Sequence, residues 1–224
     1  MRKLLLLAAT LLATGSLVPT ATASTGVTPL AGPSASQLLA KTQSCKQISS
    51  GKYKTDSELG RTVPVCDANG AVWWRADMDI DCDGQRTARC NEQTDPWFQP
   101  ETAFERSDGK PLIADQTHFV VLPSESSTWR FSSSGLAGAS ACAVIYNNKV
   151  LYASVGDTGP QDIIGEASYA TAKDLGINPD PANGGTDGPV TYICFKNSKV
   201  NPIESNSAST TLGESRATQF VSTN

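Results

Sequence analysis

The run VWWRADMDIDCDG, from Val72 to Gly84, is the stretch that points most directly to a β fold. Aromatic and apolar residues lead it, and from Asp77 onward an acidic residue stands at every second position. Side chains of a strand alternate between two faces, so this spacing puts the acidic side chains on one face. Because buried unpaired charges are costly, that face must meet water or cations. We predict a strand over residues 72–81. The four acidic residues are Asp77, Asp79, Asp81 and Asp83.

A hairpin is the next β signal along the chain. Residues 141–146 and 150–155 are apolar and flank the pair Asn147-Asn148. Asn tolerates positive φ, which tight hairpin turns require, so the two segments are expected to pair. The other strand candidates are residues 118–122, 190–195 and 217–221.

Helix is predicted at only two places. One is a short helix over residues 36–41, and the other covers residues 165–175, with Gly176 at its end and Pro179 just beyond. The segment from 178 to 189 is rich in Pro, Gly and Asp and is expected to be a loop. The predicted fold class is therefore mostly β, a compact barrel or sandwich with one main inserted helix and a loop-rich periphery.

The first 23 residues have the three parts of a secretory signal peptide. Arg2 and Lys3 come first, a short run of Leu and Ala follows, and Ala21-Thr22-Ala23 forms the small-residue exit. The apolar run is too short for a resident membrane helix, so we expect cleavage after Ala23 and a secreted, extracellular protein. The remaining 201 residues suit a flexible lead over 24–40 and a single domain over 41–224.

All six cysteines follow the predicted signal peptide, and an even number in an exported protein indicates three disulfides. Proximity favours Cys82–Cys90. Cys142 and Cys194 lie in apolar β-type runs and could bridge two strands, which leaves Cys45–Cys66. A zinc site is the alternative, but the chain has no C-x-x-C pair and a single histidine.

The charge of the chain limits its partners. Without Arg2 and Lys3, 16 of the 18 basic side chains remain against 22 acidic ones. An acidic surface repels nucleic acid and anionic membranes and attracts a polycation. We therefore expect no nucleic-acid partner, and no membrane association after signal cleavage.

The acidic strand itself has three interpretations. Residues 79–84 match the start of a calcium loop, but the twelfth position, where a bidentate Glu belongs, is Cys90. A merely solvated face is the second, although such faces usually mix Thr, Lys and Ser. The third is a groove that holds the ammonium groups of an aminosugar polymer, and this is the reading that the pattern favours.

Two further carboxylates stand in glycine-bordered positions. Asp157 follows Gly156 at the end of an apolar strand, and Glu166 follows Gly165 at the predicted start of the helix. Hydrolysis of a glycosidic bond needs two facing carboxyl groups, which these two residues could supply. A purely structural role is the alternative for both residues, because Gly-Asp is a common turn and Glu is favoured in the first turn of a helix.

Other catalytic classes fit less well. His118 could serve a serine hydrolase, but no G-x-S-x-G elbow is present, and a copper mono-oxygenase needs more histidine. No phosphate loop appears, and paired cysteines leave no free thiol. Among the aromatic residues, Trp73 would share the face of Asp77 and, with Tyr169, could contact sugar rings.

Several long motifs together resemble one enzyme family. They are VWWRADMDIDCDG (72–84), GDTGP (156–160), IGEASY (164–169), LGINPDP (175–181) and the glycine pair 184–185. In this order they resemble the fungal and streptomycete chitosanases of glycoside hydrolase family 75, over about residues 45–195. The GDTG turn is also similar to that of double-psi β-barrel hydrolases, so the resemblance implies a six-stranded barrel of that type.

The resemblance implies a secreted endo-chitosanase that cleaves β-1,4 bonds of chitosan by inversion, without metal or other cofactor, and makes 41–224 the catalytic domain. It implies Asp157 and Glu166 as the catalytic pair. We expect Asp77, Asp79, Asp81, Trp73 and Tyr169 to bind substrate, and the protein to be a monomer. Glu166 is assigned as the acid and Asp157 as the base. A helix N-terminus would favour the charged form of Glu166, so either burial and nearby Asp charges outweigh the helix or the two roles are exchanged. The alternatives are a non-catalytic, calcium-stabilised polysaccharide-binding module, or a barrel hydrolase acting on cellulose or peptidoglycan.

Overall fold

A computed structural model describes residues 32–224 of the chain. The predicted signal peptide and the first part of the predicted lead lie outside these residues. The strands are β1 (Lys46–Gln47), β2 (Cys66–Ala68), β3 (Ala71–Asp81), β4 (Phe119–Pro123), β5 (Ala141–Tyr146), β6 (Lys149–Gly159), β7 (Glu166–Ser168) and β8 (Thr186–Phe195). The helices are α1 (Ala35–Ala40), the 3-10 turn η1 (Ser132–Ser134), α2 (Tyr169–Leu175) and α3 (Asn206–Thr223).

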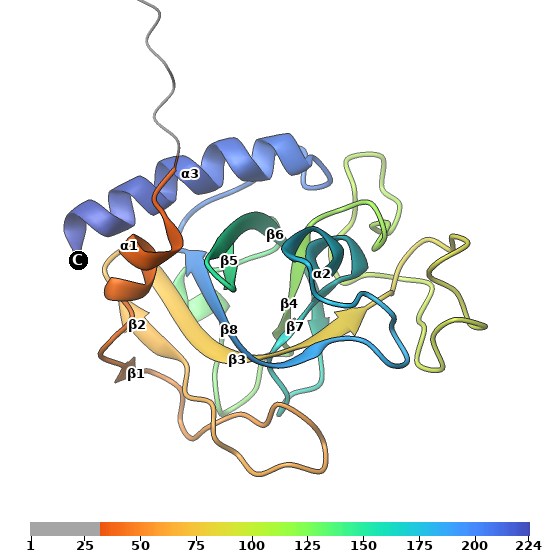
Figure 1. Ribbon diagram of the computed structural model, residues 1–224, viewed down its shortest axis with the longest axis horizontal. Helices are drawn as coiled ribbons and strands as arrows, with labels where there is room; N and C mark the ends of the chain where they lie inside the picture. Colours follow the sequence, from red (N-terminus) through yellow and green to blue (C-terminus); the bar gives the residue numbers. More distant parts are fainter. Residues whose placement is uncertain (1–31) are drawn as a thin grey trace, which may run out of the picture. The chain divides into compact units, whose positions relative to one another are not determined.

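Six of the strands close into a barrel (Figure 1). Their order around it is β3, β7, β4, β6, β5, β8, and β8 pairs again with β3. Two of the pairings, β3 with β7 and β4 with β6, are parallel, and the other four are antiparallel. The predicted mostly β, six-stranded barrel is confirmed, while its double-psi connectivity stays a prediction.

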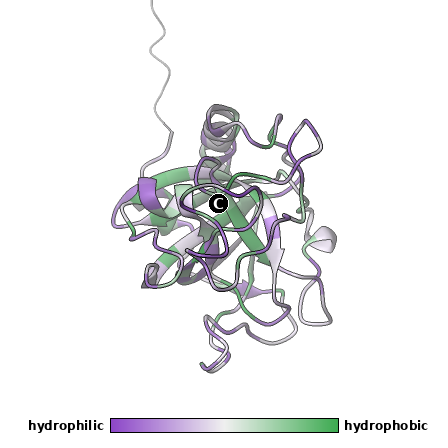
Figure 2. Cartoon of the chain, turned by 90° about the vertical axis from the view of Figure 1, so that its right-hand side faces the viewer, coloured by the Kyte–Doolittle hydropathy of each residue, from purple (hydrophilic) through white to green (hydrophobic). Residues whose placement is uncertain are grey.

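Alternate residues of every barrel strand fill the interior. This interior cluster includes Val72, Trp74, Ala76, Met78 and Ile80 of β3, with Val120, Val144, Val155, Ala167 and Tyr192 from the other strands. In Figure 2 the strands are largely green and the loops around them purple or white, as expected if the strands supply the apolar core. The outward residues of β3 are therefore the odd-numbered ones, and they include the acidic residues.

Helix α3 covers the outside of β5 and β6, with α1 beside it (Figure 1). Its buried residues are Ser209, Gly213, Ala217 and Phe220, which recur at helical spacing. The prediction of a last strand over 217–221 was wrong, because a helix face of small residues lacks the apolar pattern that reveals most helices. The short helix predicted over 36–41 is confirmed as α1, which lies within the predicted lead.

The predicted hairpin and all three predicted disulfides are confirmed. Asn147 and Asn148 both have positive φ and join β5 to β6. The disulfides are Cys45–Cys66, Cys82–Cys90 and Cys142–Cys194. The third joins directly paired positions of β5 and β8, so it crosslinks the barrel wall. Among residues 32–224, no helix combines the length and the apolar character needed to cross a bilayer.

Candidate active site

Asp157 and Glu166 flank one residue of the strand between them. Val121 of β4 pairs with Asp157 on β6 and also with Glu166 on β7. Neighbouring strands lie about 4.8 Å apart, so the two backbones are about 10 Å apart across β4. Paired residues point to the same face of a sheet, so the two carboxyl groups share the outer face of the barrel. On the other side of β7, Asp79 of β3 pairs with Glu166 and extends the row.

A β-bulge gives Asp157 this direction. Val120 pairs with Val155, but Val121 pairs with Asp157, so Gly156 is an extra residue in β6. Without it, Asp157 would follow Val155 into the barrel interior, since residues two apart share a face. Bulges often redirect a side chain beside an active site. A Cβ on Gly156 would lie 2.5 Å from Phe119 Cβ, so only glycine fits at this position.

The carboxylate of Asp157 is buried and held by backbone donors. The residue is 5% exposed, and its Oδ1 accepts hydrogen bonds of 2.7 Å from the backbone N–H groups of Ala103 and Thr158. Burial raises the pKa of Asp157 to about 6, and the two donors limit the rise because they favour the charged form. Asp157 is therefore the member of the pair that is better prepared to be an anion.

Glu166 has the opposite preference. It is half-buried, and burial together with the charges of Asp79, Asp83 and Asp157 raises its pKa to about 8. A Cβ on Gly159 would lie 3.2 Å from Glu166 Oε2, so the missing side chain there leaves room for this carboxyl group beside the end of β6. Near neutral pH Glu166 is mostly protonated, which is the state that a general acid needs.

The secondary structure around Glu166 differs from the prediction. Glu166 opens strand β7, and α2 begins only at Tyr169, with the Ser168 side chain accepting from Thr171 N–H as its cap. The predicted helix start at 165 was therefore wrong by four residues, because three residues first pair with β3 and β4. The conflict between a helix N-terminus and a protonated Glu166 does not arise, since Glu166 is not in the helix.

The acidic residues of β3 share the outer face but differ in exposure. Asp79 is exposed and Asp77 partly so, whereas Asp81 is only 5% exposed. Asp81 therefore does not meet water, which was one of the two surroundings expected for the acidic face. Burial and the nearby Glu166 and Asp157 carboxylates raise the pKa of Asp81 well above its usual value. A protonated Asp81 avoids the cost of a buried charge.

Asp81, Asp83 and Asp157 form a tight group. One oxygen from each lies within 4.8 Å of the others, and Asp81 Oδ1 accepts a 2.6 Å hydrogen bond from Asp83 N–H. Carboxylate oxygens are ligands that calcium prefers, so a divalent cation is the cofactor class for which this group offers donors. Cys90, at the position of the last EF-hand ligand, is in a disulfide, so the ligand set of an EF-hand is incomplete here.

The aromatic residues predicted to bind substrate lie elsewhere. Trp73 is 6% exposed and belongs to the same buried cluster as Leu38 and Phe195, so its ring has no face free to stack on a sugar. Tyr169 is half-buried and lines a separate surface hollow of about 620 Å³ with Asn178 and Asp180. The prediction for Trp73 is corrected, and Tyr169 keeps a place near the end of β7.

The fold places further carboxylates, which the sequence patterns did not predict, near the acidic residues of β3 and Glu166. Asp56 and Asp187 lie close enough to raise the pKa of Asp77 and Asp79, and Asp95 acts in the same way on Asp83 and Glu166. These residues come from loops and from the start of β8, so no periodicity in the sequence links them to the acidic strand. Together they enlarge the negative surface beside Asp157 and Glu166.

Comparisons with known proteins agree on one family. The family described as fungal chitosanase of glycosyl hydrolase group 75 matches residues 78–223. The chain is similar to an endo-chitosanase of Aspergillus fumigatus, with 33% identity over 57% of this chain and 58% of the relative. It is also similar to endo-chitosanase B of Aspergillus oryzae, with 29% identity over 65% of this chain and 68% of that protein. The match to the first relative thus spans less than two thirds of its length.

Proposed function

The chain belongs to the fungal chitosanase family of glycosyl hydrolase group 75, and on this premise we propose that it is a secreted endo-chitosanase. It hydrolyses β-1,4 bonds between glucosamine units of chitosan, and Asp157 and Glu166 are its catalytic carboxyl groups. The observation that carries this proposal is the placement of the two side chains on one face, on either side of Val121.

The two carboxyl groups have different roles in one displacement. Glu166 donates its proton to the glycosidic oxygen as the bond to the anomeric carbon breaks. Asp157 accepts a proton from a water molecule, whose oxygen bonds to the anomeric carbon from the opposite side. One proton is lost and one gained by the enzyme, and the new hemiacetal has the inverted configuration.

The spacing supports inversion over retention. Inverting enzymes separate their carboxyl groups by about 6.5–9.5 Å to admit a water, whereas retaining enzymes hold them about 5–5.5 Å apart. Backbones about 10 Å apart on next-nearest strands, with side chains on one face, suit the longer separation. The donors on Asp157 and the elevated pKa of Glu166 support the assignment of base and acid.

The acidic surface supplies a physical reason for an aminosugar substrate. Asp77 and Asp79 on β3, with Asp56 and Asp187 nearby, form a negative area next to Glu166. The ammonium groups of glucosamine are attracted to it, and the attraction weakens as salt screens the charges. Acetylated sugars are neutral, so this surface does not attract chitin electrostatically.

Reducing-end release from chitosan, chitin and cellulose tests the substrate. We expect rapid release from chitosan, a rate that falls as salt is added, and little release from the two neutral polymers. Equal cleavage of fully acetylated polymer would contradict the role of the acidic surface. Release from cellulose alone would show a different hydrolase.

Substitution of the pair tests the mechanism. Glu166→Gln and Asp157→Asn should each lower kcat by several orders of magnitude, because each removes one half of the proton transfer. Asp174→Asn is the matched control. Asp174 is on α2, its Oδ2 lies 2.8 Å from His118 Nε2, and its substitution should leave kcat near the wild-type value. Proton NMR of freshly formed product should show the α-anomer first. A β-anomer at the outset would contradict inversion.

Three disulfides support the proposal of secretion after cleavage at Ala23, because such bonds persist in oxidising compartments. The proposed enzyme is a monomer that works without a cofactor and has no membrane or nucleic-acid partner. An acidic chain with 22 Asp and Glu against 18 Lys and Arg supports the last point.

A further inference from the structure

Trp97 differs from the other tryptophans of the chain. It is 83% exposed, whereas Trp73, Trp74 and Trp129 are all buried. A single exposed apolar side chain is ordinary at a protein surface, so exposure by itself does not indicate a binding role. What separates Trp97 from an ordinary surface residue is how its backbone is held and which residues hold it.

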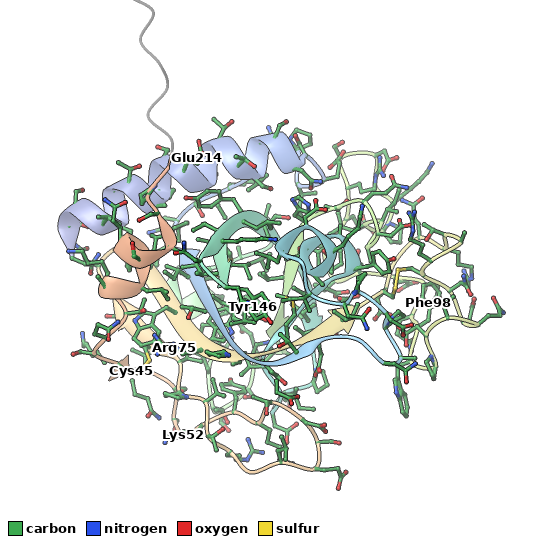
Figure 3. All side chains as sticks on the ribbon, viewed as in Figure 1. Cys45, Lys52, Arg75, Phe98, Tyr146 and Glu214 are labelled. Atoms are coloured by element: carbon green, nitrogen blue, oxygen red, sulfur yellow. A yellow bond between two sulfur atoms is a disulfide. The ribbon has the colours of Figure 1, made fainter. Side chains whose placement is uncertain are left out.

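The segment around Trp97 is fixed from both sides. Its N–H donates a 2.8 Å hydrogen bond to Asp95 Oδ1, and its carbonyl accepts one of 3.2 Å from Gln99 Nε2. The next residue, Phe98, is buried, with the guanidinium of Arg86 5.3 Å from its ring centroid. The exposed indole is therefore attached to a backbone that hydrogen bonds hold in place. Figure 3 shows Phe98 in the loops that follow β3, on the opposite side of the view from Cys45.

The same segment is bonded directly to the candidate active site. Gln99 N–H donates a 2.6 Å hydrogen bond to Asp83 Oδ1, and Gly84 N–H donates to the Gln99 carbonyl. Asp83 in turn lies in the tight carboxylate group with Asp157. Two residues span at most about 7 Å, so the Trp97 backbone lies within about 7 Å of the Gln99 backbone, which binds the Asp83 side chain.

We propose that Trp97 is a stacking platform for a glucosamine ring of the chitosan chain, next to the bond that is cleaved. This inference rests on the proposed function. An exposed indole offers its face to the C–H face of a sugar ring, and a cation beside that face is attracted by the ring quadrupole. Asp95 and Asp83, whose side chains anchor the segment, are carboxyl groups that attract an ammonium group when they are ionised.

Fluorescence quenching gives a readout that does not depend on turnover. Acrylamide should quench mainly Trp97, because the other three tryptophans are buried. In the Glu166→Gln variant, saturating glucosamine hexamer should lower this quenching severalfold. In a Glu166→Gln, Trp97→Phe double variant, quenching should be weak from the start and unchanged by the hexamer. Full quenching of Trp97 in the presence of bound hexamer would overturn the inference.

Kinetics give the second readout. Trp97→Ala should raise KM for chitosan about tenfold, with a much smaller change in kcat, and Trp97→Phe should recover most of the loss. Leu59→Ala removes the other large exposed apolar side chain among residues 32–224 and should keep KM near wild type. An unchanged KM in Trp97→Ala, with wild-type cleavage of chitosan intact, refutes the platform alone. Absence of chitosan cleavage by the wild-type protein refutes the proposed function instead.

Discussion

Asp157 and Glu166 are both carboxyl groups in low-dielectric surroundings, yet they differ in what stabilises their charge. Two backbone N–H groups donate to Asp157, while the groups that act on Glu166 are other carboxylates. The first arrangement favours an anion and the second a neutral acid. An acid and a base of the same functional group can therefore work at one pH, because their environments separate their pKa values.

The pH dependence of kcat follows from these two groups. The proposed mechanism needs Asp157 deprotonated and Glu166 protonated, so kcat should fall below about pH 6 and above about pH 8. The measurement is a pH–rate profile on a soluble glucosamine oligosaccharide. Because the groups interact, the two limbs report the pair as a whole. A rate that keeps rising from pH 6 to pH 9 would contradict Glu166 as the acid.

At the scale of secondary structure, the bulge in β6 is the element that assembles the site. One extra residue, Gly156, turns the Asp157 side chain from the barrel interior to the outer face where Glu166 lies. Strand β4 then sets the distance between the two groups, because it pairs with both β6 and β7. The geometry of the proposed catalytic pair is thus set by strand register.

Substitution of the bulge glycine tests this role. Gly156→Ala places a Cβ 2.5 Å from Phe119, so β6 must shift; we expect kcat to fall at least tenfold and stability to fall by about 1–3 kcal/mol. Gly60→Ala is the matched control, since no atom lies within 4 Å of the added Cβ. The measurements are kcat and chemical denaturation of both variants. Wild-type activity in Gly156→Ala would show that the bulge does not position Asp157.

At the scale of the whole molecule, the barrel concentrates carboxyl groups on one face. Burial raises the pKa values of Asp77, Asp81, Asp83, Asp157 and Glu166. Between about pH 4 and pH 8 the folded protein therefore binds more protons than the unfolded chain, whose carboxyl groups ionise near pH 4. The free energy of unfolding must fall as pH rises through this window.

Thermal denaturation measures this linkage. We expect Tm to be highest near pH 4–5 and to decrease toward pH 8, with a loss on the order of a few kcal/mol in unfolding free energy. Asp81→Asn removes a buried titrating group and should make the decrease shallower. A Tm that rises from pH 5 to pH 8 would mean that these carboxyl groups are ionised in the folded state at low cost.

Much of this molecule can be predicted from local patterns in its sequence. Alternation along residues 72–81 gives the strand and its acidic face, Asn147-Asn148 gives the hairpin, and cysteine spacing with apolar context gives the three disulfides. The long motifs around Asp157 and Glu166 indicate the family. All of these signals depend on residues that are close together in the chain or on motifs read directly from it.

Other features depend on contacts between distant segments. The Gly156 bulge turns Asp157 outward, and neighbouring structure buries Asp81 on a face that alternation alone predicts to be wet. Trp73 is buried on the outer face of the barrel, in one cluster with Leu38 of α1, although strand alternation suggested that it could contact a sugar ring. The physical reason is common to all three: alternation fixes which side of a strand a residue faces, but only the packed fold decides what covers that side.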